Sequence, residues 1–386
     1  MKPERDSLFQ VRARGKLLAT LIPVTGRFRF RSGVVRRSRA YVLSRFAYCR
    51  RAGRDLILES PLAHARLILH GGSGAACLAE LVRPCRPSDL PKRISGLTPQ
   101  AALKFFSLLR HAGALSEADR RGRASEDRDP SLFSWEFHDL LFHSRSRVGR
   151  HDAPYGRTER FGRSAAIPPV SKPRMSDDSI VLPRPDIPAL RSRDVPFTRV
   201  LEDRRSKRIH GPAALSFAQL GEFLYRSARI RRVFKLKGNT FTERAYPCSG
   251  AAYELELYPV IGRCRGVPPG LYHYEPLRHR LDRLSGRTKA VQRMLASAAA
   301  TAHTSPPHVL IVLSARFQRV SLKYQTIAYA SILKDVGALY QTFYLVATAM
   351  NLSPCALGVG DSDLFAEAAG LRYFEETSVG EFILGR

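Results

Sequence analysis

The chain has 386 residues, 44% of them hydrophobic, so it is long enough for two domains and can bury a sizeable core, which excludes a disordered chain. Its 63 basic and 34 acidic residues give a formal net charge of +29, a balance that suits binding to nucleic acid. Against that function, 52 of the basic residues are arginines spread along the whole chain. The densest stretch, residues 1–50, would instead attract an acidic peptide or protein.

Metal-binding and targeting patterns are missing from the sequence. The six cysteines include no CxxC pair, and His138, His143 and His151 match no common zinc spacing, so we predict neither a metal site nor a disulfide framework. The first apolar stretch, residues 17–24, is too short for a membrane span and carries Pro23. These features predict a soluble, cytoplasmic protein that contacts no membrane.

Residues 1–125 are predicted to form a small N-terminal module. Its expected elements are strands at 40–46 and 55–59, a turn at 51–54, and helices at 75–81 and 98–114. Strands followed by short helices are similar to a winged-helix or peptide-clamp module.

Residues 126–194 are predicted to be a linker and an arm. Charged and small residues from 118 to 130 indicate an exposed linker, and residues 135–143 form a short amphipathic stretch. Six prolines between positions 168 and 188 disfavour helices and central strands. We therefore expect the arm to lie extended across another surface.

Residues 195–386 are predicted to form one α+β domain. A capping-box pattern from Ser216 to Gln219 opens a helix. Alternation over residues 253–257 predicts a strand whose Glu254 and Glu256 face solvent. Further expected elements are a buried strand at 308–315, a helix buried on nearly all sides at 331–351, and a last strand at 382–384. The chain lacks the βαβ alternation of a doubly wound fold, and the run from Gly72 to Gly74 lacks the third glycine of a dinucleotide fingerprint.

Two segments of this domain suit a ligand site, and a third is another loop of small residues. The run Arg204 to Arg208 could surround a phosphate with charge-assisted hydrogen bonds, or it could be a solvated charge run. The small residues from Pro247 to Gly250 would let backbone N–H groups approach a flat ring, or they form an ordinary tight turn. The acids of the loop 357–363 suit a helix N-terminus rather than a phosphate.

Taken together, these segments resemble the nitroreductase superfamily of flavoproteins and, more narrowly, the SagB-type, ThcOx-like azoline dehydrogenases of thiazole/oxazole-modified peptide biosynthesis. The resemblance extends from about residue 131 to the end. The segments that carry it are 135–147, 204–208, 246–250, 270–274, 328–360 and 378–385.

The resemblance implies an antiparallel-rich sheet flanked by helices, a homodimer, and an FMN site between its subunits. The implied cofactor-binding residues are Arg204, Arg205, Ser206 and Arg208 for the phosphate and ribityl chain, Pro247, Cys248, Ser249 and Gly250 for the ring or its dimer-related edge, Gln341, and Gly358 and Gly360 near the flavin N5. Two positions depart from the family pattern, because Cys248 stands where serine is usual and Thr342 where asparagine is usual.

The same resemblance assigns catalytic roles to Lys323 and Tyr324, within a Leu-Lys-Tyr match. Aromatising an azoline removes a proton from one carbon and a hydride from its neighbour, so the flavin accepts the hydride and the protein supplies a base. A desolvated Lys323 would be that base, and Tyr324 would relay or stabilise charge. Spacing alone allows a surface lysine and a core tyrosine as the alternative.

The predicted function is FMN-dependent oxidation of thiazoline or oxazoline rings in a ribosomally made peptide, with oxygen reoxidising the flavin. The N-terminal module would dock the precursor's leader or a cyclodehydratase subunit. One alternative is an NAD(P)H-dependent nitro or quinone reductase, although such an enzyme has no need of the long N-terminal half. Alternatives of another class are a non-catalytic binding subunit that retains the fold and a basic nucleic-acid binder.

Overall fold

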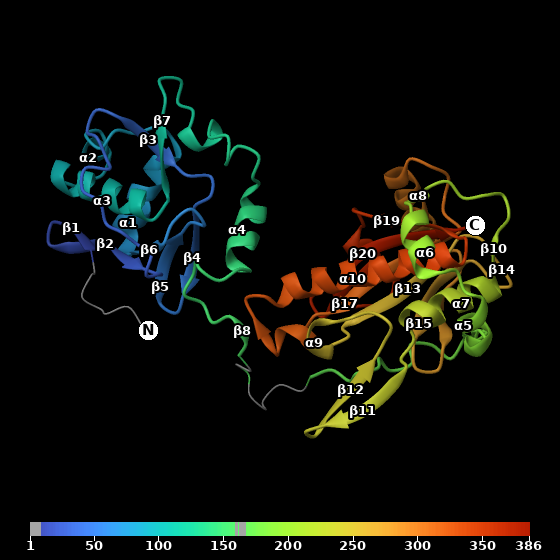
Figure 1. Ribbon diagram of the computed structural model, residues 1–386. Helices are drawn as coiled ribbons and strands as arrows, with labels where there is room; N and C mark the ends of the chain where they lie inside the picture. The colour runs from blue at the N-terminus through green and yellow to red at the C-terminus, as the bar shows by residue number, and fades with distance from the viewer. Residues whose placement is uncertain (1–8, 159–160, 162–166) are drawn as a thin grey trace. The chain divides into compact units, whose positions relative to one another are not determined.

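The computed structural model describes residues 9–158, 161 and 167–386, and the chain divides into two compact units, residues 1–155 and 156–386 (Figure 1). We call them the N-terminal unit and the C-terminal unit. The division falls inside residues 126–194, which we predicted as a separate linker and arm. The first part of that segment belongs to the N-terminal unit and the remainder to the C-terminal unit.

The N-terminal unit contains a five-stranded antiparallel sheet in the order β1-β2-β6-β5-β4. Its strands are β1 (Phe9–Ala13), β2 (Lys16–Pro23), β4 (Tyr48–Ala52), β5 (Asp55–Glu59) and β6 (Ala65–Leu69), while β3 (Ala40–Leu43) pairs separately with β7 (Leu115–Ala118). Its helices are α1 (Gly71–Ala79), α2 (Leu90–Arg93), α3 (Pro99–His111) and α4 (Phe137–Arg145). Helix α3 begins where predicted, because the Thr98 hydroxyl accepts the Ala101 N–H at 3.1 Å, and it buries Phe105 and Phe106 in the core.

Two details predicted for this unit are wrong. The strand expected at 40–46 ends at Leu43 and pairs with β7, while the turn expected at 51–54 is confirmed between β4 and β5. The segment 118–130 is not wholly exposed, because Glu126 is only 5% exposed. Its carboxylate accepts hydrogen bonds from the Ser44 hydroxyl and the Arg45 N–H, both at 2.7 Å.

The C-terminal unit is built on a seven-stranded antiparallel sheet in the order β19-β20-β17-β13-β15-β16-β9. Its strands are β9 (Ser179–Val181), β13 (Leu255–Ile261), β15 (Gly270–Glu275), β16 (Arg280–Ser285), β17 (Val309–Arg316), β19 (Ser353–Leu357) and β20 (Glu376–Gly385). Three short pairs join β8 (Gly156–Arg157) to β18 (Tyr324–Gln325), β10 (Leu215–Ser216) to β14 (Cys264–Arg265), and β11 (Arg232–Leu236) to β12 (Asn239–Glu243). The helices are α5 (Ile187–Arg193), α6 (Phe197–Asp203), α7 (Phe217–Ala228), α8 (Lys289–Ala302), α9 (Gln318–Ser321), α10 (Ala328–Ala349) and α11 (Ser362–Ala368).

Helices cover both faces of this sheet, so the α+β fold class is confirmed. Ile311 and Leu313 of β17 pack in one core with α7 and α10, and Leu310 and Val312 pack in another with α8 and α11. Since successive side chains of a strand point to opposite faces, a strand covered on both sides must be apolar throughout. The buried strand predicted at 308–315 is thereby confirmed and explained.

The solvent-exposed face predicted for residues 253–257 is wrong, because both faces of the sheet are covered. Glu254 and Glu256 are 0% and 2% exposed. Arg316 Nε lies 2.9 Å and His273 Nε2 3.1 Å from the carboxylate of Glu256. Although burial raises its pKa, these partners lower the pKa of Glu256 to about 2.

The helix predicted at 331–351 is confirmed as α10, but the prediction that nearly all its sides are buried is wrong for the single chain. One side enters the core through Ile332, Val336, Leu339, Phe343 and Ala347. Leu333, Gly337 and Gln341 lie exposed along the opposite side. The helix therefore keeps one open face in a single copy of the chain.

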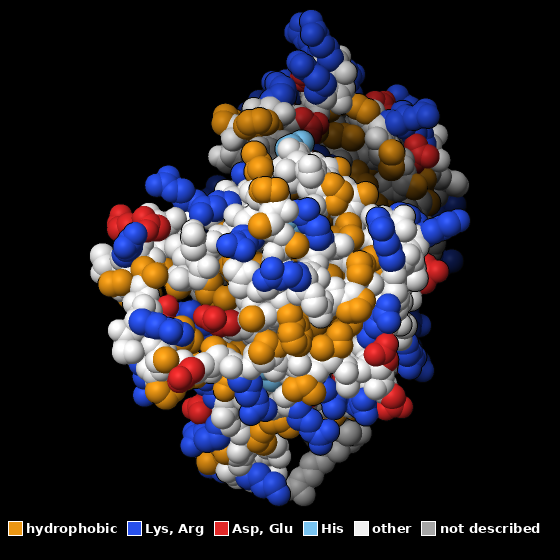
Figure 2. All heavy atoms as spheres, turned by 90° about the vertical axis from the view of Figure 1, so that its right-hand side faces the viewer, with side chains coloured by type: hydrophobic (Ala, Val, Ile, Leu, Met, Phe, Trp, Pro, Cys, Tyr) orange, Lys and Arg blue, Asp and Glu red, His pale blue; other side chains and the backbone are white. Residues whose placement is uncertain are grey.

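Two further predictions concern a cap and the surface. The capping box of α7 is confirmed, because the Ser216 hydroxyl accepts the Gln219 N–H at 3.2 Å and the Gln219 side chain accepts the Ser216 N–H at 3.0 Å. On the face shown in Figure 2, Lys and Arg side chains are interspersed with apolar and uncharged ones rather than gathered in one patch. None of the helices in the described part of the chain combines the length and hydropathy needed to span a membrane.

Candidate functional site

The predicted phosphate cluster lies directly after α6, beside the second half of α10. The Ser206 hydroxyl is 2.8 Å from the Tyr344 hydroxyl, and the Arg204 guanidinium lies 5.3 Å from the centre of the Tyr344 ring. The Lys207 N–H donates to the Pro354 carbonyl at 2.8 Å, which ties the segment to β19. These contacts hold the backbone of the cluster on the body of the C-terminal unit.

The arginines of this cluster remain available to an anion. Arg205 and Arg208 are exposed, and no carboxylate in the described part of the chain pairs with them or with Arg204. The nearby Asp203 carboxylate pairs with Arg199 at 3.4 Å instead. Three guanidiniums and a hydroxyl therefore fit a phosphate, which they would hold through charge-assisted hydrogen bonds.

Gln341 belongs to the same region of the molecule. It is exposed on α10 three residues before Tyr344, and side chains three residues apart on a helix are neighbours. Tyr344 also accepts the Ala356 N–H at 2.8 Å, so it connects the cluster, α10 and β19. The sequence analysis missed Tyr344, which looked like one more apolar position of a buried helix.

The turn from Pro247 to Gly250 is held by the first half of α10. Asp335 accepts the Ser249 N–H at 3.0 and 3.1 Å on its two carboxylate oxygens and the Ser249 hydroxyl at 3.0 Å. Gly250 has a φ of +56°, and a Cβ added there would lie 2.1 Å from the Tyr324 hydroxyl. A glycine is required at this position both by the backbone conformation and by the close approach of Tyr324.

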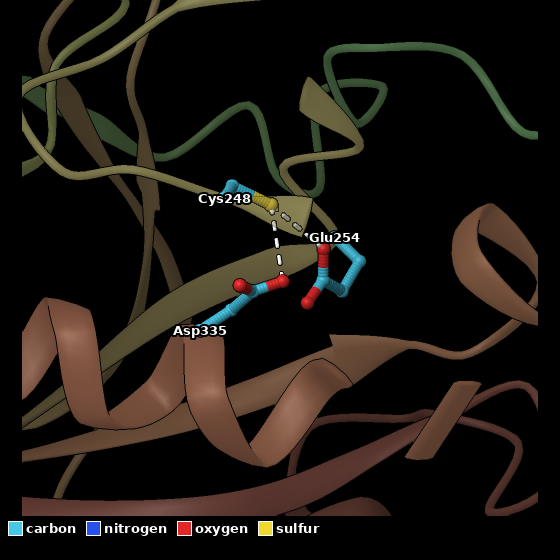
Figure 3. A group of neighbouring side chains, drawn as sticks. All are labelled: Cys248, Glu254 and Asp335. Carbon is cyan, nitrogen blue, oxygen red and sulfur yellow. Dashed lines mark hydrogen bonds between the residues drawn. The ribbon is translucent and has the colours of Figure 1, made fainter. Parts of the chain in front are cut away.

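The partly buried Cys248 of this turn forms a cluster with the buried carboxylates of Glu254 and Asp335 (Figure 3). The Cys248 sulfur lies 3.2 Å from Glu254 Oε2 and 3.3 Å from Asp335 Oδ2, so its one S–H can donate to either carboxylate. Burial and then the charge of Asp335 raise the pKa of Glu254 to about 7, and burial raises the pKa of the Cys248 thiol. The three ligand atoms lie within 4.8 Å of one another, close enough to hold a metal ion, although we predicted no metal site. Protons on the thiol and on one carboxylate can also neutralise the cluster.

Lys323 and Tyr324 lie together at the wall of a cavity of about 620 Å³ in the C-terminal unit. Lys323 follows α9, where its N–H donates to the Val320 carbonyl at 3.0 Å, and its ammonium lies 5.8 Å from the centre of the Phe241 ring. Burial, and then the positive charges of Arg319 and Arg157, lower the pKa of Lys323. Gly250 lines the same cavity, so the structure brings the turn and the Lys-Tyr pair together.

Gly358 and Gly360 lie in the loop after β19, and neither is among the residues that line the Lys323 cavity. A Cβ at Gly360 would lie 1.9 Å from a carboxylate oxygen of Glu381, so the loop packs closely on β20. Asp361 caps α11 by accepting the Leu364 N–H at 2.9 Å. This cap confirms the prediction that the acids of the loop serve a helix N-terminus.

The predicted phosphate cluster and the turn at Ser249 contact two opposite flanks of α10 in one chain. Asp335, which holds the turn, and Tyr344, which holds the phosphate cluster, are nine residues apart. At 3.6 residues per turn and 1.5 Å per residue, this spacing corresponds to a rotation of about 180° and a rise of about 13 Å. The open face with Leu333, Gly337 and Gln341 lies away from the core.

The cyanobactin oxidase ThcOx family model matches residues 41–152, and the nitroreductase family model matches residues 201–386. One relative is MJ1384 of Methanocaldococcus jannaschii, whose name describes it as a nitroreductase; it is 28% identical over 47% of this chain and 85% of that protein. The microcin B17-processing protein McbC of Escherichia coli is 29% identical over 32% of this chain and 49% of that protein. The trifolitoxin-processing protein TfxB of Rhizobium leguminosarum bv. trifolii is 25% identical over 42% of this chain and 44% of that protein. The match therefore spans about half the length of the two peptide-processing relatives.

One solved structure that the chain matches is the E. coli microcin synthetase McbBCD complex with truncated pro-MccB17 bound. That likeness has 19% identity and a TM-score of 0.40, and it covers 56% of this chain and 87% of the matched chain.

Proposed function

Because residues 201–386 match the nitroreductase family model and residues 41–152 match the cyanobactin oxidase model, we propose that this protein is an FMN-dependent dehydrogenase that oxidises thiazoline or oxazoline rings in a ribosomally made peptide. The observation that carries the proposal is the partly buried Lys323, whose pKa is lowered, beside Tyr324 at a cavity of about 620 Å³. Two relatives named for peptide processing support this substrate class.

The residues present fit FMN in two places. The unpaired guanidiniums of Arg204, Arg205 and Arg208, together with the Ser206 hydroxyl, would hold its phosphate. At the turn, the Tyr324 hydroxyl lies where a Gly250 side chain would be, so a flat ring at this wall of the cavity would meet that hydroxyl. When bound, the flavin supplies a hydride acceptor.

Lys323 would take the proton that must leave the ring carbon. An amine beside other cations in a partly dry cavity is easier to deprotonate, so a larger fraction is neutral and able to act as a base. Tyr324, in contact with Gly250, would orient the ring or stabilise charge through its hydroxyl. Arg319 is bonded to the Ala252 carbonyl at 2.7 Å, so it is placed to lower the lysine pKa rather than to act on substrate.

We further propose that the cofactor site is shared between two copies of the chain. Within one copy, the phosphate cluster and the turn lie on opposite flanks of α10. The open face of that helix, with Leu333 and Gly337, offers an apolar surface for a second copy. A homodimer would bring the cluster of one copy toward the turn of its partner.

The proposed partners are the precursor peptide and a cyclodehydratase subunit that makes the azolines. The N-terminal unit, which carries the cyanobactin oxidase match, is the part we assign to docking one of them. The Lys and Arg excess of residues 1–50 suits an acidic peptide.

The test is to incubate the purified protein with an azoline-containing peptide in air and to measure the peptide's mass. Loss of two hydrogens per ring, with a flavin absorbance spectrum from the protein, is the expected result. The second candidate function, an NAD(P)H-dependent nitro or quinone reductase, is favoured by the similarity to MJ1384. Reduction of nitro compounds with NAD(P)H and an unchanged peptide mass would support that candidate instead.

A further inference from the structure

The cavity at Lys323 has a second wall made by the hairpin of β11 and β12. This two-stranded ribbon projects from the C-terminal unit and belongs to no larger sheet in the described part of the chain (Figure 1). Four consecutive residues, Gly238 to Phe241, line the cavity. Alternate side chains of a strand point to opposite faces, so a wall made by consecutive residues is the edge of the strand.

The turn of the hairpin shows which backbone groups that edge carries. Lys237 and Gly238 have φ values of +47° and +78°, which is a two-residue turn with both central residues left-handed. In such a hairpin the closing pair, Leu236 and Asn239, exchanges hydrogen bonds, and the pairs then alternate along the ladder. The next pair, Lys235 and Thr240, is therefore a non-hydrogen-bonded pair.

The N–H and C=O of Thr240 consequently point away from β11, toward the cavity. No hydrogen bond joins the backbone of Thr240 to any described residue outside the hairpin, and its side chain is exposed. Further along the strand Thr242 is buried next to the 3-10 helix Ser249–Ala251, so the edge is open only at its Thr240 end. An open strand edge is a template for pairing with another extended chain.

From this arrangement we propose that the edge of β12 binds the backbone of the substrate peptide as an added strand, through the N–H and C=O of Thr240. This inference rests on the proposed function and names how that function's substrate is held. The cavity is much larger than a five-membered ring, so it has room for residues on either side of the azoline. Strand addition positions a peptide mainly through its backbone, which suits one enzyme acting on several rings in different sequence contexts.

The charges around the cavity restrict the segment that binds. Lys323, Arg157 and Arg319 line it. A neutral or acidic segment satisfies these groups, whereas a basic one would be repelled. The occupant is therefore an extended, neutral or acidic stretch of the azoline-containing peptide.

The experiment compares two proline variants by fluorescence anisotropy with a labelled azoline-containing peptide. Thr240→Pro removes the N–H on the cavity edge, and Lys235→Pro removes the matched N–H on the outer edge of β11. Neither N–H is used inside the hairpin, so neither variant removes a hydrogen bond between β11 and β12. We expect Thr240→Pro to bind the peptide about fivefold to tenfold more weakly, as one lost hydrogen bond implies, and Lys235→Pro to bind like the wild type.

A second readout uses peptides N-methylated at one residue at a time. One position at a fixed distance from the ring should lose affinity, because the Thr240 carbonyl can then accept no hydrogen bond. If the wild-type protein oxidises the peptide and Thr240→Pro binds it with unchanged affinity, the inference is overturned but the proposed function is not. If Thr240→Pro changes the oligomeric mass and not the peptide affinity, the edge of β12 is a subunit contact, and the inference is overturned as well. Wild-type protein that neither binds nor oxidises the peptide overturns the proposed function, and the inference with it.

Discussion

Replacing Lys323 by alanine should abolish most azoline oxidation and leave the cofactor in place. The lysine lines the cavity proposed for the substrate, whereas the residues assigned to the phosphate lie on the other flank of α10. Flavin absorbance and the mass of the assembly should therefore match those of the wild type. The lost step is removal of the ring proton.

The size of the effect depends on whether another group in the cavity can replace the base. Among the residues that the structure describes, the other titratable side chains that line it are Arg157, Arg319 and Tyr324. Burial lowers the pKa of Arg319 only to about 10, so it stays protonated near neutral pH. With no substitute base, the full contribution of general base catalysis is lost, and turnover should fall by ~10²–10⁴-fold.

The assay is the rate at which the peptide loses two hydrogens per ring, measured by mass spectrometry beside the flavin spectrum. Lys289→Ala, which changes an exposed lysine on α8, is the matched control and should keep the wild-type rate. Reduction of the bound flavin by dithionite needs no protein base and should be unaffected. Tyr324→Phe should show a milder loss if its hydroxyl only stabilises charge.

The pH dependence gives an independent check of the same reasoning. The proposed base, Lys323, would act in its neutral form. The wild-type rate should therefore rise with pH and level off above the lysine pKa, which burial and Arg319 place below 10.5. Lys323→Arg keeps the positive charge and should lose both the rate and this rise. A Lys323→Ala enzyme that forms azoles at the wild-type rate would refute the assignment.

Three further predictions concern the cofactor, the assembly and the turn. Arg204→Ala combined with Arg208→Ala should weaken FMN binding by at least about a hundredfold and yield colourless protein, so a stoichiometric flavin content would contradict the phosphate assignment. Light scattering at micromolar concentration should give about twice the 43.2 kDa chain mass, and a monomer that retains flavin is incompatible with a shared site. Gly250→Ala should cost about 1–3 kcal/mol of the free energy of unfolding and displace Tyr324. Gly337→Ala places a Cβ in open space inside α10, so thermal unfolding should show no loss of stability or a small gain; an equal loss in both variants would contradict the contact.

Local signals in the sequence were sufficient for several elements. The cap at Thr98, the capping box at Ser216 and the cap at Asp361 were predictable because each depends on residues within one helical turn. The apolar run of β17 was equally clear, because a strand between two helix layers must be apolar on both faces. The order of the motifs also indicated the family and the identity of the candidate site residues.

Contacts between distant segments decided the rest. Glu254 alternates with leucine and tyrosine in sequence, so it was assigned to solvent, yet helices on both faces of the sheet bury it completely. Asp335 was the sequence signal that could have predicted this buried contact, because an acidic residue in so apolar a helix needs a partner. That partner is the turn at Ser249, 86 residues earlier in the chain.

Sequence by itself determined which residues are candidates for the site, since residue type and short spacing specify caps, apolar faces and motifs. Only the tertiary structure decided which candidates meet: Tyr324 contacts Gly250, while the cluster after α6 contacts Tyr344 on the opposite flank of α10. The open edge at Thr240 was likewise invisible in the sequence, because strand pairing depends on where the remaining strands run. The physical reason is that burial, hydrogen-bond partners and pKa values depend on neighbours that the folded chain brings together from distant positions.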